Sequence, residues 1–259
     1  MRSCCDGPNQ ASARKCSQTS RHLSFAFRRT IHNLSRVKQD GWETMSSERH
    51  FANAHLEVAT DQVQTPTRCK PRWWTVVHRK AAVIIAPMTR NDKIVLICQE
   101  RIPIRTTIWE MPSGQIDNSV AGVGLSAVTS TLRSTATEDG SAKADAPSHR
   151  AVETIEQVAL RELREEAGYE LAKDGELIPL GYYFTSPGFT DERGYFFLAR
   201  PVEPCPNYVR DEAESILDCR AFSVPEIRRM IVESEICDAN TLSMWARLSA
   251  HDLLPARER

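Results

Sequence analysis

The chain has 259 residues, of which 41% are hydrophobic and 26% are charged, and its formal net charge is −1. This composition is ordinary for a globular protein of one large or two small domains, and the near-neutral charge excludes a strongly basic nucleic-acid-binding protein. No apolar run approaches the roughly 20 residues that span a bilayer, so we expect neither a nucleic-acid partner nor a membrane span.

The first 50 residues differ in composition from the rest. Residues 1–50 are rich in Arg, Lys, Ser and Asn, and Asp6 is the only acidic residue before Asp40. A basic, weakly amphipathic segment of this kind is typical of mitochondrial and other organellar targeting peptides. The preferred alternative is a disordered tail, or sequence upstream of a start at Met45. We therefore predict a disordered or targeting extension over residues 1–50 and a globular domain over residues 51–259.

Runs of β-branched residues predict the strands of this domain. Residues 73–87 and 92–101 are rich in Val and Ile and are separated by a turn-like cluster. Residues 177–186 and 194–202 predict two further strands, joined by a loop over residues 187–193. Sheet strands therefore lie on both sides of the middle of the chain.

The middle of the chain contains an irregular stretch followed by a helix. Residues 118–148 are rich in Ser, Thr, Ala and Gly and have no sustained periodicity, so we predict a flexible insertion. Ser148 is a suitable N-cap for the following helix, and Gly168 is suited to its C-terminal end.

Two further helices are predicted near the C-terminus. Ser223 and Glu226 have capping-box spacing, and Asp238 is the expected cap of the last helix. Mixed strands, one central helix and terminal helices predict a single α/β (α+β) domain with a partly antiparallel sheet.

The eight cysteines are scattered through the chain. None forms a CxxC pair, and no paired Cys/His spacing is typical of zinc. Free thiols are typical of a reducing compartment. We therefore predict a cytoplasmic protein, with organellar delivery by the N-terminal extension as the alternative.

The central helix carries carboxylates on its apolar face. On a wheel with about 100° per residue, Glu162 and Glu166 fall about 20° on either side of Ile155, in the middle of the apolar stripe, and Glu165 falls at its edge. Unpaired carboxylates on a packing face are unfavourable, so a positive partner is expected. Hard oxygen ligands in one patch suit Mg²⁺ or Mn²⁺ rather than zinc. The alternative is a structural helix with ion pairs, for which Arg161 is available.

The same residues carry a family resemblance. Glu153, then seven residues, then RELREEAGY resembles the end of the Nudix hydrolase box, G-x5-E-x7-R-E-U-x-E-E-x-G-U, where U is apolar or aromatic. The positions that fit are Glu153, Arg161, Glu162, Leu163, Glu165, Glu166, Gly168 and Tyr169. Eight restricted positions in register make this a specific signal.

The front of the box departs from the pattern. Pro147, not glycine, stands six residues before Glu153. The upstream stretch around Gly114 is similar to the strand and glycine that open the box, so we take Gly114 as the box glycine. Its partner would then stand at position 120 instead of 153, so 33 residues are inserted. The inserted residues include the irregular stretch over residues 118–148, and a loop can be lengthened in this way at modest entropic cost.

The resemblance implies a fold and a metal. The fold is a mixed β-sheet sandwiched between helices, with a loop–helix–loop Nudix box that binds divalent metal and is here interrupted by an insertion. The implied ligands are Glu162, Glu165, Glu166 and the backbone carbonyl of Ser113, and the implied ion is Mg²⁺, with Mn²⁺ as an alternative. The remaining box residues are expected to be structural: Gly114, Glu153, Arg161 and Gly168.

Three stretches outside the box resemble ADP-ribose and nucleotide-sugar pyrophosphatases. They are residues 97–117, 185–199 and 236–248. In relatives of this type, a glutamate in an S-P-G-x-[ST]-x-E loop positions or deprotonates the attacking water, and Glu192 matches it. The resemblance thus implies catalysis by Glu192 together with Glu165 and Glu166. The alternative for Glu192 is an exposed loop residue without a role in the reaction.

Other residues are candidates for substrate binding. Arg101 and Arg105 resemble arginines that such enzymes direct at the diphosphate or terminal ribose, and a solvated basic pair is the alternative. Trp73 and Trp74 face opposite ways in a strand, and one is expected to stack on an adenine or to lie in the core or a dimer interface. By analogy with relatives that exchange N-terminal strands, we expect a homodimer.

The leading prediction is a Mg²⁺-dependent Nudix pyrophosphatase that hydrolyses ADP-ribose or a related nucleoside diphosphate sugar to two monophosphates. One alternative keeps the chemistry but changes the substrate to a dinucleotide polyphosphate or a flavin or nicotinamide dinucleotide. Another is a catalytically silent Nudix module that binds a nucleotide or a partner. The intact set Glu162, Glu165 and Glu166 favours an enzyme.

Overall fold

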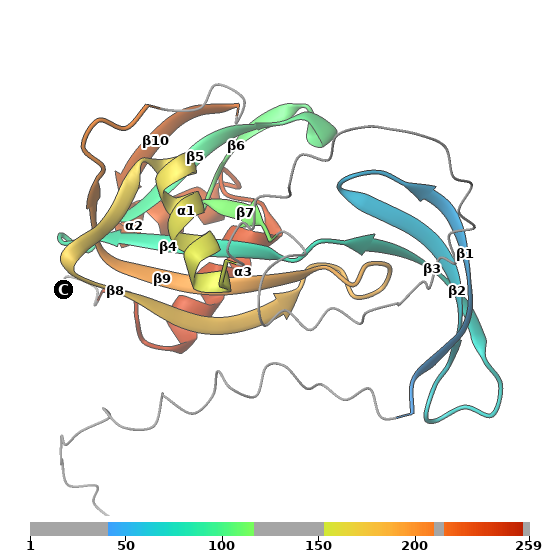
Figure 1. The fold of residues 1–259 in the computed structure, drawn as a ribbon. Helices are drawn as coiled ribbons and strands as arrows, with labels where there is room; N and C mark the ends of the chain where they lie inside the picture. The colour runs from blue at the N-terminus through green and yellow to red at the C-terminus, as the bar shows by residue number, and fades with distance from the viewer. Residues whose placement is uncertain (1–40, 117–152, 210–214, 256–259) are drawn as a thin grey trace, which may run out of the picture. The chain divides into compact units, whose positions relative to one another are not determined.

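The computed structural model describes residues 41–116, 153–209 and 215–255 (Figure 1). These residues belong to one unit of the chain, Lys38–Arg259. The predicted insertion and residues 1–40 of the predicted N-terminal extension lie outside them. Within the described ranges, no helix has both the length and the apolar character needed to cross a membrane.

The first described elements form a three-stranded antiparallel sheet. Its strands β1 (Glu43–Ala52), β2 (Leu56–Gln64) and β3 (Arg72–Arg79) pair in the order β1-β2-β3. The turn between β1 and β2 is closed by Asn53, whose side-chain Oδ1 accepts hydrogen bonds from the backbone N–H groups of His55 and Leu56, as Asn does in tight turns. β1 begins inside the range that the sequence assigns to the extension.

A seven-stranded mixed sheet forms the centre of the domain. Its strands pair in the order β10-β5-β4-β9-β8, with β6 added to β5 and β7 added to β4. β4 and β9 run parallel, and the other pairs are antiparallel. The strands are β4 (Ala82–Thr89), β5 (Ile94–Arg101), β6 (Thr106–Glu110), β7 (Ser113–Gln115), β8 (Tyr169–Phe184), β9 (Arg193–Pro204) and β10 (Ile216–Phe222), and a short 3-10 helix (Ile102–Ile104) follows β5.

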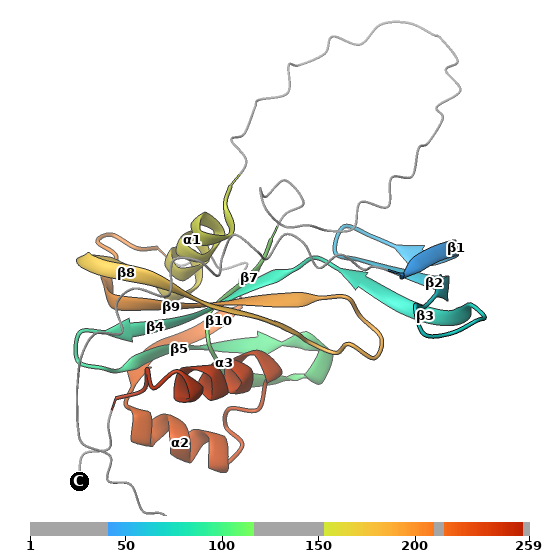
Figure 2. The same cartoon turned by 90° about the horizontal axis from the view of Figure 1, so that it is seen from below.

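Helices cover both faces of this sheet, as Figure 2 shows. Helix α1 (Ile155–Ala167) lies on one face, and α2 (Val224–Val232) and α3 (Ala239–Ala250) lie on the other. The buried side chains alternate accordingly along β4: Val83 belongs to the cluster packed on α1, and Ile84 to the cluster packed on α2 and α3. Because both faces are buried, β4 reads as a continuous apolar run. The predicted mixed sheet between helices is confirmed.

Strand boundaries differ from the sequence prediction at several points. The single run predicted over residues 73–87 is two strands, because the chain leaves the small sheet at the end of β3 and enters the large sheet at β4. β8 starts at Tyr169, well before the predicted strand. The edge strand β10 was not predicted.

The helix ends follow side-chain capping. Thr154, not Ser148, is the N-cap of α1, because its hydroxyl accepts a hydrogen bond from the backbone N–H of Gln157 in a capping box. The predicted end at Gly168 is confirmed, with φ of 68° in the left-handed region. The predicted caps Ser223 and Asp238 are also confirmed.

Candidate active site

The carboxylates of α1 divide between the interior and the surface. Glu162 and Glu166 are buried, with 8% and 4% of their surface exposed, whereas the side chain of Glu165 is about half exposed. Their neighbours on the buried face are Val158 and Leu163 in the core. The helical wheel therefore predicted the buried pair correctly.

The backbone of β7 lies directly against these two carboxylates. The backbone N–H of Ser113 donates a hydrogen bond to Oε2 of Glu166 at 2.6 Å. A Cβ atom placed on Gly114 would lie 1.9 Å from Cδ of Glu162. Only glycine leaves room for the Glu162 carboxylate at this point, which explains a glycine here in physical terms. The residues before and after the long insertion are thus brought together.

Arg161 pairs with the other carboxylates of the box. Its guanidinium lies 2.9 Å from Glu162, 2.7 Å from Glu165 and 3.4 Å from Glu153. One cation is thus shared by three acids, and it compensates part of their charge. Gly168 closes the same helix, and a Cβ there would lie 2.5 Å from the ring of Tyr208.

The donor chemistry of this region fits a hard divalent cation. The groups present are carboxylate and backbone oxygens, which Mg²⁺ and Mn²⁺ prefer. Two of the carboxylates are buried, and a buried carboxylate needs positive charge nearby. Across the described ranges, no three His, Cys, Asp or Glu side chains are already gathered as a metal-ligand group.

A cleft of about 530 Å³ opens beside β7. It is lined by residues of the box opening, of the loop after β8, of β3 to β6 and of the start of α3. The polar residues among them are Arg79, Arg101, Glu110, Ser113, Gln115, Thr185, Glu192, Asp238 and Asn240. The predicted residues Ser113, Gly114, Arg101 and Glu192 therefore share one cleft.

Glu192 is held in this cleft by two donors. Its Oε2 accepts a hydrogen bond from the hydroxyl of Thr185 at 3.0 Å and from the guanidinium of Arg79 at 3.2 Å. The residue is 9% exposed. It is therefore not the freely exposed loop side chain of the alternative interpretation.

Arg101 also lines the cleft and is paired with an acid. Its guanidinium is 2.7 Å from Glu110, whose side chain is almost fully buried. Burial raises the pKa of Glu110 above its ordinary value, and Arg101 only partly opposes this. Arg101 is thereby directed along the cleft wall by a buried acid.

The other predicted substrate-binding residues lie outside the cleft lining. Arg105 is exposed and follows the 3-10 helix in a left-handed conformation with φ of 54°. Trp73 and Trp74 are about half exposed on β3. The indole N–H of Trp74 donates a hydrogen bond to the carbonyl of Gly188, in the loop that carries Glu192, at 2.8 Å.

Two charged residues of the cleft that pair with predicted site residues, Arg79 and Glu110, were not predicted from the sequence. Arg79 ends β3 and contacts Glu192, and Glu110 ends β6 and holds Arg101. Neither belongs to a local motif, because each contact depends on strands pairing across the chain. The signal that could have indicated a role in the site is their position at the end of a strand, where the chain enters a loop and binding residues are common.

The comparisons with known proteins agree with this geometry. Residues 149–239 match the family model of the NUDIX domain. The chain is 24% identical over 216 residues to the ADP-ribose pyrophosphatase of Bacillus subtilis (strain 168), covering 83% of this chain and 97% of the relative. It is 26% identical over 200 residues to the methanol dehydrogenase activator of Bacillus methanolicus, covering 77% and 88%.

A solved structure shares the fold. The crystal structure of an ADP compounds hydrolase matches with a TM-score of 0.57 at 14% identity, over 81% of this chain and 93% of that chain. The NUDIX match begins just before Glu153 and extends beyond Glu192, so it contains α1 and the loop after β8. Residues 149–239 of this chain therefore carry a NUDIX domain, and this domain together with the similarity to an ADP-ribose pyrophosphatase indicates a Nudix hydrolase.

Proposed function

We propose that the protein is a Mg²⁺-dependent pyrophosphatase that hydrolyses the diphosphate bond of ADP-ribose or a related nucleoside diphosphate sugar to two monophosphates. The observation that carries this proposal is the cleft that Glu192 shares with the Ser113–Gly114 backbone, which contacts Glu162 and Glu166. Glu192, proposed for water activation, thus lines the cleft, and the acids proposed for metal binding contact the β7 backbone that forms part of its wall.

The metal would be held by Glu162, Glu166 and the backbone carbonyl of Ser113, with Glu165 assisting. When bound, divalent cations neutralise diphosphate oxygens and favour attack by water. The contribution of the chain is a pair of buried carboxylates held by the core and by the β7 backbone. Mn²⁺ is the expected substitute for Mg²⁺, because it accepts the same oxygen ligands.

Glu192 would accept the proton of the attacking water. Both donors to its carboxylate reach the same oxygen, Oε2, so the other oxygen is available to a water. Because Thr185 and Arg79 fix this orientation, the carboxylate does not have to be ordered during the reaction.

The two arginines of the cleft suit a diphosphate substrate. Arg79 and Arg101 both line the cleft, and guanidinium groups match phosphate oxygens in geometry and charge. Each is fixed by one acid, Glu192 and Glu110 respectively. The proposal for ADP-ribose itself is supported by similarity to a named ADP-ribose pyrophosphatase over nearly its whole length.

We further propose that the active form is a homodimer joined through the small sheet. Every residue of β1 is exposed, and large apolar side chains on or beside this sheet are about half exposed. They are Trp42, Met45, Phe51, Trp73 and Trp74. Apolar side chains gathered on one sheet are typical of an interface, and a second copy would cover them or place a tryptophan on the adenine. Sedimentation of the wild type as a monomer at micromolar concentration would exclude this arrangement.

The thiols are consistent with a proposed cytoplasmic location. Five cysteines lie in the described ranges, and none of these five forms a disulfide bond: Cys69, Cys98, Cys205, Cys219 and Cys237. Free thiols persist in reducing compartments. Fractionation of cells that express the full chain would test this, because organellar recovery would support targeting by residues 1–50 instead.

A substrate panel tests the proposed activity. The wild-type chain is incubated with Mg²⁺ and ADP-ribose, several nucleotide sugars, dinucleotide polyphosphates, and flavin and nicotinamide dinucleotides, and monophosphate products are separated and quantified. We expect the highest kcat/KM with ADP-ribose or a nucleotide sugar, and no turnover with a chelator. Highest turnover with a dinucleotide would show that dinucleotides, and not ADP-ribose or nucleotide sugars, are the substrate class. No product from any compound would favour a catalytically silent binding module.

A further inference from the structure

The loop that carries Glu192 is attached to strand β3 of the small sheet. Besides the Trp74 contact with Gly188, the backbone N–H of Val77 donates to the carbonyl of Phe189 at 2.7 Å. The last residue of β3, Arg79, reaches Glu192 itself. The site therefore depends on a strand that is not part of the central sheet.

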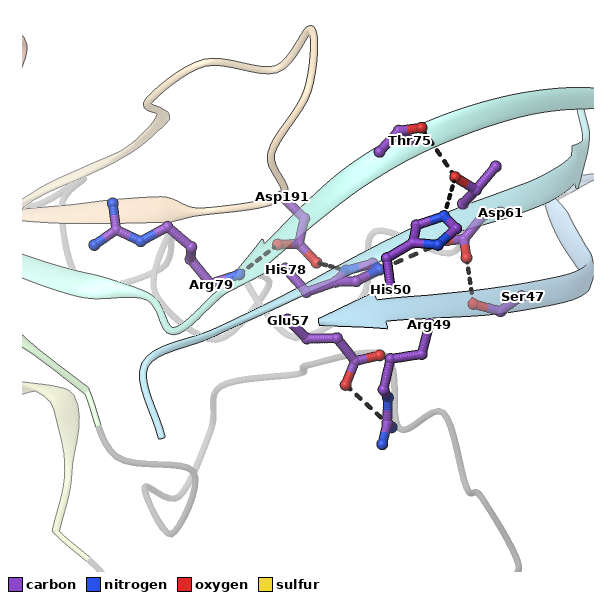
Figure 3. Close-up of polar contacts among 10 residues, drawn as sticks. Ser47, Arg49, His50, Glu57, Asp61, Thr75, His78, Arg79 and Asp191 are labelled. Carbon is purple, nitrogen blue, oxygen red and sulfur yellow. Dashed lines mark hydrogen bonds and ion pairs between the residues drawn. The ribbon is translucent and has the colours of Figure 1, made fainter. Parts of the chain in front are cut away.

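His78 lies at the centre of this attachment (Figure 3). Its Nδ1 is 2.8 Å from Oδ2 of Asp191, the residue next to Glu192. The other oxygen of Asp191 accepts the backbone N–H of Arg79 at 3.1 Å. Two consecutive residues of β3 thus hold both oxygens of one loop carboxylate, which fixes its position more strongly than one contact.

A second carboxylate faces the other ring nitrogen. Nε2 of His78 is 3.7 Å from Asp61 on β2, and Asp61 also accepts a hydrogen bond from the hydroxyl of Ser47 on β1 at 2.6 Å. An imidazole between two carboxylates is best satisfied when both nitrogens carry protons. The loop is therefore connected through His78 to all three strands of the small sheet.

The charges around His78 favour its protonated form. The hydrogen bond with Asp191 raises the pKa of His78 most, the charges of Asp191, Asp61 and Glu57 raise it further, and burial opposes them. Glu57 is itself paired with Arg49 on β1, at 3.1 Å. Burial raises the pKa of Asp191, but its hydrogen bonds from His78 and the N–H of Arg79 outweigh this, so that pKa is lowered.

The direction of the pH dependence follows from these shifts. A histidine whose pKa is raised by folding stabilises the folded state fully below its unfolded pKa. This stabilisation is lost as pH rises through the folded pKa. An aspartate whose pKa is lowered by folding stabilises the folded state fully above its unfolded pKa. This stabilisation is lost as pH falls through the folded pKa. The charged pair is complete between those limits. At higher pH neutral His78 can still donate a hydrogen bond to the Asp191 carboxylate, but the attraction between opposite charges is lost.

We propose that His78 is a positioning residue for hydrolysis, which holds the Glu192 loop on β3 through Asp191 and so fixes the orientation of the Glu192 carboxylate. This inference rests on the proposed role of Glu192. It goes beyond that role, because it gives strand β3 of the small sheet a part in positioning the Glu192 carboxylate. A purely structural role for His78 would predict lower stability with unchanged turnover per folded molecule.

The test compares His78→Ala, His78→Asn and Asp191→Asn with the wild type, and uses His50→Gln as the matched control. His50 is a histidine of the same sheet whose Nε2 contacts the hydroxyl of Thr60 at 2.7 Å. We expect kcat with the best substrate to fall about 10-fold or more in His78→Ala, because a charged hydrogen bond is lost. His78→Asn keeps a neutral donor and should recover part of this loss, and the control should stay near wild-type kcat.

Two readouts separate positioning from stability. The kcat of the combined variant His78→Ala/Asp191→Asn should be no lower than that of the slower single variant, because both changes break the same hydrogen bond between His78 and Asp191. The ratio of wild-type kcat to His78→Asn kcat should be larger at about pH 6 than at about pH 9. A His78→Ala kcat within about 2-fold of wild type, or a fall fully explained by unfolded protein, would overturn the proposal.

Amide hydrogen exchange tests the attachment without any substrate. Backbone N–H groups of the loop are hydrogen-bonded within it, including Phe189 and Thr190 to the carbonyl of Ser186. Loosening of the loop in His78→Ala should speed their exchange, with no change in α1. Unchanged exchange would refute the attachment even if the wild type is an active hydrolase. Faster exchange with an inactive wild type would instead leave the attachment standing and refute the proposed function.

Discussion

The site has two acidic sides, which are held in different ways: the α1 acids contact the β7 wall of the cleft, and the Glu192 carboxylate lines the cleft itself. Glu162 and Glu166 are on a helix whose apolar face packs in the core, and the backbone of Ser113 and Gly114 lies against them. Glu192 is on a loop, and its position depends on hydrogen bonds from Thr185 and Arg79. The first side is positioned by burial, and the second by polar contacts between separate strands.

This difference separates stability from chemistry. A substitution on the helix side alters a packed interior, where even small changes of volume are felt. A substitution on the loop side changes polar contacts at the edge of a cleft, which belong to the less stable part of a fold. We therefore expect the two sides to respond differently to matched substitutions.

The largest expected effect is that of Glu166→Gln. The amide keeps the shape of the side chain and an oxygen for the N–H of Ser113, so the fold should persist. We expect kcat to fall more than about 100-fold. Loss of a residue that only supports a metal ligand costs up to about 100-fold, and loss of a ligand itself should cost more. The matched control is Glu156→Gln, an exposed acid in the first turn of the same helix. Near-normal turnover by Glu166→Gln would refute the metal assignment.

Glu192→Gln should be nearly as damaging to turnover but neutral to stability. Loss of a general base lowers kcat by roughly 100-fold to 10,000-fold, and no core contact is changed. Steady-state kinetics and thermal unfolding measure the two effects separately. The control Glu176→Gln changes an exposed acid of β8 that pairs with Arg200. A large fall in thermal midpoint for Glu192→Gln would contradict the contrast between the two sides.

A pair of glycine substitutions compares the tightness of the two sides directly. Gly114→Ala places a Cβ 1.9 Å from the Glu162 carboxyl carbon, whereas a Cβ on Gly188 in the loop meets no atom within 4 Å. We expect Gly114→Ala to lower the free energy of unfolding by about 1–3 kcal/mol, as overpacking does, and to lower turnover. Gly188→Ala should leave the free energy of unfolding unchanged. Equal denaturation curves for the two variants would be evidence against the tight packing.

The smallest expected effect concerns Glu110 and has a defined pH dependence. Its pKa is raised mainly by burial, so its charged form costs stability above the folded pKa, and the cost disappears below the unfolded pKa. Glu110→Gln should therefore unfold at a higher temperature than the wild type at neutral pH, with the difference vanishing in acid. Because Arg101 loses its partner, KM should rise roughly 3- to 10-fold. Lower stability at neutral pH would show that the ion pair outweighs burial.

The helix side of the site could be predicted from the sequence because its signals are local. The wheel positions of Glu162 and Glu166 and the end at Gly168 depend only on neighbours within the same helix. The exception was the helix start, where Ser148 was a plausible cap in sequence but Thr154 has the partner that forms the box.

The loop side could not be predicted to the same depth. β1 is exposed throughout, so it shows no hydrophobic alternation to mark it as a strand. No Gly, Pro, Asn or Asp stands between β3 and β4, so no turn signal marks the change of sheet between them. The contacts of Arg79 and His78 with the Glu192 loop span more than a hundred residues of sequence, and strand pairing alone creates them.

The most direct test of the central claim is Mn²⁺ binding by the wild type, Glu166→Gln and Glu192→Gln, measured from the paramagnetic resonance of free Mn²⁺ without substrate. If the helix side holds the metal and the loop side serves the chemistry, Glu166→Gln should weaken binding at least about 10-fold, and Glu192→Gln should bind like the wild type. Wild-type affinity in Glu166→Gln, or equal weakening in both variants, would contradict the account.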